Sequence, residues 1–437
     1  MILISIDTLR ADHLTPYGYA RETSPRTAAF ARRAIVFEEA YSQSPKTAAS
    51  HMTLMTSLHP EVHGVGNPGP DRRQTSLSRD VPTLAERLRE AGYRTHAIHG
   101  GGNVRPAYGF ARGFESYVEE RDLEQWLLLA RQVIERHEAA APDGAPLFLF
   151  LHTYQVHSPY APPPEHERLF ARPGYAGRIV SSPAELARLA SFPERNHFFW
   201  KRVDTSSPED VRHLEDLYDA GIHYTDARLG DFLEWLEARS LWPRTLLVLL
   251  ADHGEEFGEH GAFRHTTLHR ETLHVPLVMR FPGDDPALQP RRIGAVVRLL
   301  DVMPTVLEAA ELPPLARAEG RSLLPVLRGA PTETPVVWSQ VRRGGAAALR
   351  VGDWKLIRGR RGDQLFHVTE DPGERTDLLA REPQRAAELG ARLSSLLADA
   401  ASLRASFSAP SEGPLDPEAV RELRALGYLP AGPEKPR

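Results

Sequence analysis

The side chains that could hold a metal ion stand directly after apolar runs of the sequence. Asp252 and His253 follow the run Thr245-Leu-Leu-Val-Leu-Leu-Ala251, and the glycine behind them allows a sharp turn. Carboxylate oxygen and imidazole nitrogen are both common ligands of divalent cations. Taken alone, this pair is equally compatible with a charged surface turn, but two other apolar runs end in the same way, at Asp7 and at His152.

These three runs are typical of buried strands in a parallel sheet, whose carboxyl ends meet at one edge. Asp7 and Asp252 would approach each other there, and neighbouring carboxylates repel unless a cation lies between them. We therefore expect one divalent metal held by Asp7, Asp252 and His253, with a fourth ligand from elsewhere in the chain. Ligation by oxygen and imidazole suits calcium, magnesium, manganese or zinc, and the sequence does not choose among them.

A polar loop at residues 42–51 is the candidate source of the fourth ligand. Its Thr47 hydroxyl is a weak nucleophile at neutral pH, but a metal lowers the pKa of bound water from about 15.7 to about 7 and should act similarly on an alcohol. We predict that a helix starts near Ser50 and directs backbone N–H groups at an anionic substrate. A hydroxyl, a metal and a helix N-terminus together favour attack on a phosphate or sulfate ester.

Composition excludes several classes of protein and site. The 437-residue chain has no cysteine, which excludes disulfides, thiolate metal ligands and a cysteine nucleophile. Its formal net charge of −5 argues against a nucleic-acid-binding protein. No run approaches the ~20 apolar residues needed to cross a membrane. A strand begins at Ile2, so the chain as written is expected to be cytoplasmic; a missing N-terminal signal would make it periplasmic or secreted.

Strands and helices alternate along the chain to about residue 330. This alternation predicts an α/β fold, with a doubly wound, mostly parallel sheet in a domain at residues 1–330. Short runs between residues 336 and 368, with helices near 384–398 and 417–426, predict a small C-terminal α+β domain at residues 331–437. The segment 160–207 is rich in proline, arginine and serine, and we expect it to be a surface excursion over the site.

The order of the motifs resembles the sulfatase family, within the alkaline phosphatase superfamily. The resemblance spans nearly the whole chain and rests on Ile6-Asp7-Thr8-Leu9-Arg10, Thr47-Ala-Ala-Ser50-His51, His157-Ser-Pro-Tyr160, Asp252-His253-Gly254-Glu255, Trp354-Lys-Leu-Ile and Leu426-Gly-Tyr-Leu.

The resemblance implies an alkaline-phosphatase-like fold and a role for each matched residue. It assigns Asp7, Asp252 and His253 as metal ligands, and Thr47 as both the remaining ligand and the nucleophile. His157 and His265 stand where the family has substrate-binding or leaving-group residues, so the resemblance makes them the expected catalytic partners of Thr47.

Several positions depart from the family pattern. The family oxidises a cysteine or serine at the nucleophile position to formylglycine, an aldehyde that Thr47 cannot yield. Asn103 stands where the family has a histidine that steadies the formylglycine, and His51 replaces an arginine. We expect substrate contacts from His51, His152 and Asn103. A threonine nucleophile resembles the phosphodiesterase and phosphoethanolamine-transferase branches of the superfamily.

The expected activity is metal-dependent hydrolysis of a sulfate or phosphate ester through a covalent Thr47 intermediate, with His157 or His265 protonating the leaving oxygen. The alternatives are a phosphodiesterase or phosphonate-ester hydrolase, a phosphoryl transferase of the phosphoethanolamine type, and a catalytically silent metal- or ligand-binding relative. The expected substrate is a small molecule or a carbohydrate or lipid ester. The leaving group, the oligomeric state and a second metal among His152, His157 and His265 stay open.

Overall fold

The computed structural model describes residues 1–66, 73–140, 144–189, 192–331, 333–341, 345–359, 362–410, 412–414 and 420. Apart from residue 420, the predicted helix at 417–426 lies outside these residues, as does the closing Leu426-Gly-Tyr-Leu motif. None of the described helices is both long and apolar enough to span a bilayer.

An eight-stranded sheet forms the centre of the molecule, with strand order β11-β2-β10-β7-β1-β6-β4-β5. Every strand runs parallel to the others except β10, which is antiparallel to both of its neighbours. The predicted doubly wound, mostly parallel sheet is therefore confirmed. The strands are β1 (Ile2–Ile6), β2 (Ile35–Tyr41), β4 (Arg94–His99), β5 (Ser116–Glu119), β6 (Leu147–Thr153), β7 (Leu247–Leu250), β10 (His274–Arg280) and β11 (Arg291–Arg298).

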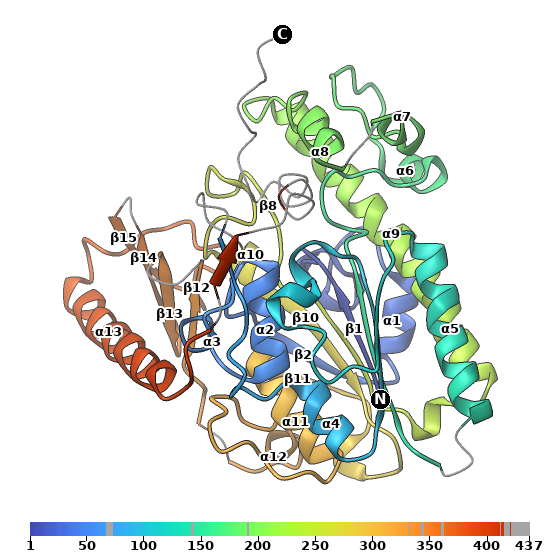
Figure 1. Cartoon of the computed structure of the whole chain (residues 1–437). Coiled ribbons are helices and arrows are strands. Elements are labelled where there is room, and N and C mark those ends of the chain that lie inside the picture. The colour runs from blue at the N-terminus through green and yellow to red at the C-terminus, as the bar shows by residue number, and fades with distance from the viewer. Residues whose placement is uncertain are drawn as a thin grey trace.

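Helices cover both faces of this sheet (Figure 1). One layer contains α1 (Pro25–Ala31), α5 (Leu123–Ala140) and the long α9 (Pro208–Ala238), and the other contains α2 (Thr47–Thr56), α4 (Leu84–Glu90) and α11 (Val302–Ala309). The central strands are consequently buried on both faces: all five residues of β1 and all four of β7 are buried. This explains why these strands are almost entirely apolar in sequence.

The excursion between β6 and α9 is not irregular throughout, because it contains three short helices, α6 (Pro164–Phe170), α7 (Pro183–Ala187) and α8 (Phe192–Trp200). They gather at one end of α9 (Figure 1), and α6 packs against it. The remaining short elements of the described chain are α3 (Pro60–His63), β3 (Arg73–Thr75), β8 (Glu256–Phe257), β9 (Phe263–Arg264), α10 (Arg270–Leu273), α12 (Leu324–Leu327) and β16 (Glu412–Pro414).

A smaller antiparallel sheet follows, with order β12-β13-β14-β15, and its strands are β12 (Val337–Gln340), β13 (Ala347–Val351), β14 (Trp354–Gly359) and β15 (Gly362–His367). Helix α13 (Pro383–Ala405) packs against β13 and β14. The two sheets share one hydrophobic cluster, to which β13, β14 and β15 contribute Leu349, Leu356 and Leu365. The boundary predicted at residue 330 falls between the two sheets, and a division of the chain there stays a prediction.

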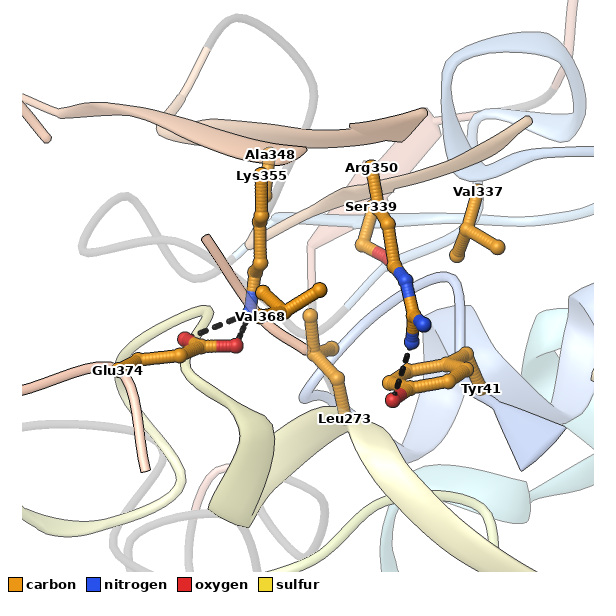
Figure 2. A pocket seen from close by; sticks show the side chains of 9 residues that line it. All are labelled: Tyr41, Leu273, Val337, Ser339, Ala348, Arg350, Lys355, Val368 and Glu374. Atoms are coloured by element: carbon orange, nitrogen blue, oxygen red, sulfur yellow. Dashed lines mark hydrogen bonds and ion pairs between the residues drawn. The ribbon is translucent and has the colours of Figure 1, made fainter. Parts of the chain in front are cut away.

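Two charged side chains of the small sheet make close contacts, and one of them reaches Tyr41 of β2 in the large sheet, as Figure 2 shows. Arg350 donates to the Tyr41 hydroxyl at 2.6 Å, and the buried Lys355 ammonium donates to both oxygens of Glu374 at 2.7 and 2.8 Å. The cavity between these pairs is only ≈ 10 Å³, about the room of one water molecule. This interface therefore joins the sheets and is not a ligand site.

The Lys355–Glu374 pair predicts a specific pattern of stabilities. Lys355→Met should lower the free energy of unfolding by about 3–5 kcal/mol, because it leaves the Glu374 carboxylate buried without its partner. The double variant Lys355→Met/Glu374→Gln should recover most of that loss. Urea denaturation measures both, and Arg385→Met, which breaks the exposed 3.0 Å pair with Glu388, is the control; it should change stability by less than about 1 kcal/mol. Equal instability of the single and double variants would contradict this account.

Candidate active site

The predicted metal ligands Asp7, Asp252 and His253 lie at the carboxyl ends of the adjacent strands β1 and β7, and the predicted substrate contact His152 lies at the same end of the next strand, β6. Asp7 follows β1, Asp252 and His253 follow β7, and His152 is the penultimate residue of β6. All four side chains are fully buried. The parallel register thus brings together groups that are 245 residues apart in sequence, as expected for a site at the edge of an α/β sheet.

The carboxylates are buried without the hydrogen-bond donors that they need. Both oxygens of Asp7 and Oδ2 of Asp252 accept no hydrogen bond from the described residues. Burial, and for Asp252 also the charge of Asp7, raises the pKa of each carboxyl well above its usual range. The side chains of Thr47 and Asp252 lie near Asp7 and act to lower its pKa, against the effect of burial. Neither makes a hydrogen bond of normal geometry to the Asp7 carboxylate. Unpaired buried carboxylates of this kind are normally held by a cation.

The hydrogen bonding of His253 completes a donor set for that cation. Its Nδ1–H donates to the Gly254 carbonyl at 2.9 Å, so Nε2 carries a lone pair. Nε2 lies 3.3 Å from Asp252 Oδ2, another acceptor. Asp7, Asp252 and His253 each offer a ligand atom within 4.8 Å of the others. These residues therefore fit a divalent cation; the identity of the metal stays open, and the ligand assignment stays a prediction.

Thr47 is the first residue of α2, and its hydroxyl Oγ1 lies 3.3 Å from His253 Nε2. The helix thus begins three residues earlier than predicted, with Lys46 as N-cap, and the prediction of a start near Ser50 is wrong. Ser50 does not cap the helix, because its hydroxyl donates to the Asp252 carbonyl at 2.7 Å. The N–H groups of the first turn, which an α-helix leaves without intrahelical acceptors, accordingly lie at the Thr47 end of α2.

Thr8 holds a strained backbone directly behind Asp7. Its φ of 58° is unusual for a β-branched residue and costs of the order of 1–3 kcal/mol. In this conformation the Thr8 N–H points to Asp252 Oδ1 at 3.4 Å, and the Thr8 hydroxyl donates to the Asp7 carbonyl at 2.8 Å. The strain therefore serves to bring the ends of β1 and β7 together.

His51 connects the Thr47 helix to the strand that carries Asp7. Its Nδ1–H donates to the Thr47 carbonyl at 2.9 Å, which leaves Nε2 to accept the Ser5 hydroxyl at 2.9 Å. Ser5 stands two residues before Asp7 and so on the same face of β1. Both ring nitrogens of His51 are thereby engaged by protein groups. A substrate contact by His51 stays a prediction, and the geometry shows it holding α2 against β1.

His157 and His265 lie beside His253, where catalytic partners of Thr47 were expected. The His265 ring centroid is 4.5 Å from that of His253 and 5.5 Å from that of His157. Each of the two donates Nδ1–H to a carbonyl, of Ser158 at 2.6 Å and of Pro45 at 3.0 Å respectively, which places the lone pair on Nε2. Burial lowers the pKa of both imidazoles, that of His157 to about 4.

His152 and Asn103 lie on the opposite side of the site. Gly100 N–H donates to His152 Nδ1 at 3.3 Å, so the proton sits on Nε2, which faces Asp7 Oδ2 at 3.5 Å. Asn103 is fully buried and its amide Nδ2 has no acceptor among the described residues. Its backbone N–H donates to the Tyr154 hydroxyl at 3.1 Å, and the Tyr154 ring centroid lies 4.7 Å from that of His152. Substrate contacts by His152 and Asn103 stay predictions.

Three residues of the site were missed from the sequence: Ser5, Lys46 and Tyr154. Lys46 Nζ donates to the His265 carbonyl at 2.8 Å, and Tyr154 packs between His152 and His157. Ser5 did leave a signal, because it is the one polar residue of the strand Ile2–Ile6. Lys46 and Tyr154 could have been found only through their positions next to Thr47 and His152.

A further group of metal-ligating side chains, Glu256, His260 and His269, lies apart from the Thr47 cluster. The His260 and His269 rings are stacked, with centroids 3.6 Å apart and planes at 9°. A metal bound to imidazole nitrogen lies in the ring plane, so two parallel stacked rings cannot share one ion. His260 Nε2 instead lies 3.2 Å from Glu271 Oε2, so a partner within the protein accounts for its position.

Two family models match most of the chain between them. The sulfatase family model matches residues 1–312, and a model described as N-sulphoglucosamine sulphohydrolase, C-terminal, matches residues 258–401. Arylsulfatase K of Gallus gallus is 32% identical over 205 residues, which are 43% of this chain and 38% of that protein. The chain thus spans well under two thirds of the length of the curated relatives it matches.

Solved structures share the fold over nearly the whole chain. The phosphonate monoester hydrolase of Agrobacterium radiobacter has a TM-score of 0.72 at 21% identity, covering 91% of this chain and 95% of that chain. The structure of BT4656 in complex with its substrate D-glucosamine-2-N,6-O-disulfate has a TM-score of 0.73 at 17% identity, covering 93% of this chain and 98% of that chain.

The unpaired carboxylates predict an unusual effect of removing a charge. In metal-free protein, Asp7→Asn should raise the free energy of unfolding by about 1–3 kcal/mol, because it removes a buried, repelling charge. The same variant should lose the stabilisation that an added divalent metal gives the wild type. Denaturation in chelator, and then with calcium, magnesium, manganese or zinc, measures both. The exposed Asp399→Asn is the matched control, and loss of stability by Asp7→Asn in chelator would contradict the proposed cation site.

The connection through His51 predicts coupled effects of two substitutions. Ser5→Ala and His51→Ala should each destabilise the protein by about 1–3 kcal/mol, and the double variant should show a coupling of at least about 0.5 kcal/mol. A double-mutant cycle in urea measures the coupling. His96 and Ser116, joined by a 2.8 Å contact between β4 and β5, provide a matched pair away from the site. Additive effects of Ser5→Ala and His51→Ala would show that the two side chains do not act together.

Proposed function

This chain belongs to the sulfatase family, and from that premise we propose that it cleaves a phosphate or sulfate ester through a covalent intermediate on Thr47. One observation carries the proposal: the Thr47 hydroxyl lies 3.3 Å from the Nε2 lone pair of His253, within the buried set that also holds Asp7 and Asp252. A hydroxyl at this place is a nucleophile with its activating groups already around it.

Asp7, Asp252, His253 and Thr47 would hold the metal. When bound, a divalent cation supplies charge that stabilises an alkoxide and the ester oxygens. The chain itself contributes position: His51 and Ser50 fix the first turns of α2 against β1 and the end of β7, so that Thr47 Oγ1 keeps its place beside His253. Such positioning is a large part of the effect of an enzyme on an ester.

The two histidines give the proton a route. With Nδ1–H bonded to a carbonyl, His157 and His265 each present an Nε2 lone pair that can take the proton of Thr47 as its oxygen bonds to phosphorus or sulfur. The imidazolium then gives that proton to the leaving oxygen as its bond to phosphorus or sulfur breaks. In the second half of the reaction, water attacks phosphorus or sulfur and the bond to Thr47 Oγ1 breaks. The histidine takes a proton from the attacking water and gives it to Thr47 Oγ1.

The chemistry of threonine favours phosphoryl over sulfuryl substrates. Thr47 cannot form the aldehyde on which the formylglycine enzymes of the family depend. Fold neighbours that include phosphonate monoester hydrolases of Agrobacterium radiobacter and Silicibacter pomeroyi support cleavage at phosphorus, while the disulfated sugar of BT4656 supports cleavage at sulfur. We therefore infer a phosphodiester or phosphonate monoester as the preferred substrate and a sulfate ester as the second candidate.

Substitution of Thr47 tests this mechanism. Thr47→Ala should lower kcat at least about a thousandfold, because no neighbouring group replaces the hydroxyl, and Thr47→Ser should retain much of the activity. The assay is a panel of aryl sulfate, phosphate monoester, phosphodiester and phosphonate monoester after chelation and return of each metal. The exposed Thr376→Ala is the control.

Each outcome of this panel separates one alternative. Full activity of Thr47→Ala would remove the nucleophile assignment. Turnover of aryl sulfate without turnover of phosphodiester would reverse the preference for phosphorus. Transfer of the phosphoryl group to an added alcohol faster than to water would indicate a transferase. A wild type that binds metal and turns over none of the esters would indicate a catalytically silent relative.

A further inference from the structure

The buried site reaches the surface beside His157 and His265. Both histidines are almost fully buried, but the residues around them, Lys46, Trp200 and Arg264, are partly exposed. Thr47 lies deeper, fully buried beside His253. A leaving group that departs from an ester bound at Thr47 would therefore extend past the two histidines toward these partly exposed residues.

Two constraints hold Lys46 at the place where the buried site reaches the surface. It is the N-cap of α2 and immediately precedes Thr47, and its Nζ donates to the His265 carbonyl at 2.8 Å. Its positive charge acts on the site, because it is the largest cause after burial of the lowered pKa of His265. The ammonium is thus fixed within electrostatic range of the histidines that face the leaving group.

Arg264, the residue before His265, has a strained backbone. Its φ of 68° is a left-handed conformation that costs a non-glycine residue of the order of 1–3 kcal/mol. The guanidinium carbon lies 4.4 Å from the centre of the Trp200 ring, in a cation–π contact. Trp200 is in turn bonded through Nε1 to the Ser158 hydroxyl at 3.2 Å, next to His157. Strain at this position is typical of a residue that serves a function.

We propose that Lys46 and Arg264 form a subsite for a second negative charge, carried by the leaving group of the ester. The proposal rests on the function proposed above and narrows its substrates to esters whose leaving group bears a carboxylate, sulfate or phosphate. Arginine suits this role because its planar guanidinium can bind two oxygens of such a group at once while its face stays on Trp200. The positive charges of Lys46 and Arg264 thus favour esters with a negatively charged leaving group and attract such substrates to the site.

Matched substrates test the subsite. The phenyl and 3-carboxyphenyl forms of whichever ester class the wild type hydrolyses differ only in the charge of the leaving group. The wild type should show a KM about tenfold lower for the carboxylated form, the effect of about 1.4 kcal/mol. Arg264→Gln and Lys46→Met should each reduce this tenfold ratio of the two KM values, and the double variant should bring it close to one. Arg264→Lys should retain more of the ratio than Arg264→Gln. The preference should also shrink as ionic strength rises.

Control variants and a binding measurement separate this proposal from the proposed function. Arg32→Gln removes an exposed positive charge at the C-cap of α1 and should leave the KM ratio unchanged. Calorimetry with 3-hydroxybenzoate and phenol measures the subsite without any turnover, and only the former should bind more weakly to Arg264→Gln. If no ester is hydrolysed, the proposed function fails and calorimetry still decides the subsite. A wild type without preference for the carboxylated form, or an Arg264→Gln variant that weakens both forms equally while melting like the wild type, would overturn the subsite.

Discussion

Two neighbouring buried carboxylates, of whose four oxygens three accept no hydrogen bond from the described residues, are the constraint on which the structure depends. Asp7 and Asp252 stand at the ends of neighbouring parallel strands, and the lone pair of His253 adds a third acceptor to the same small volume. Such a cluster is unfavourable by itself, and we expect a bound cation to stabilise the fold around it. The strained Thr8 and the fully buried strands β1 and β7 are the means by which the chain holds these groups in place.

Thr47, the proposed nucleophile, is positioned from the same two strands. Ser50 bonds to the carbonyl of Asp252 itself, and His51 bonds to Ser5, two residues before Asp7. The helix that carries Thr47 is therefore fixed to the ligand-bearing strands through hydrogen bonds rather than through apolar packing alone. This arrangement ties the distance between Thr47 and His253 to the same backbone that sets the distance between the two carboxylates.

Strand ends could be predicted from the sequence because each buried strand is an apolar run that stops at a polar residue. For this reason the doubly wound sheet and the resemblance to the sulfatase family could be predicted, and both predictions are confirmed. The predicted start of α2 was wrong because Ser50 resembles a helix N-cap in sequence. In the structure its hydroxyl donates instead to the carbonyl of Asp252, 202 residues away. The role of His51 depends likewise on Ser5, and the strain at Thr8 and Arg264 depends on contacts that no local pattern records.

The central claim, one cation shared by Asp7, Asp252, His253 and the Thr47 hydroxyl, is tested most directly by anomalous diffraction from crystals grown with manganese or zinc. The account predicts a single strong peak within about 2.0–2.6 Å of a ligand atom from each of these four residues. A peak among Asp7, His51 and His152, which also bring ligand atoms within 4.8 Å of one another, or no peak at this edge of the sheet, would contradict it.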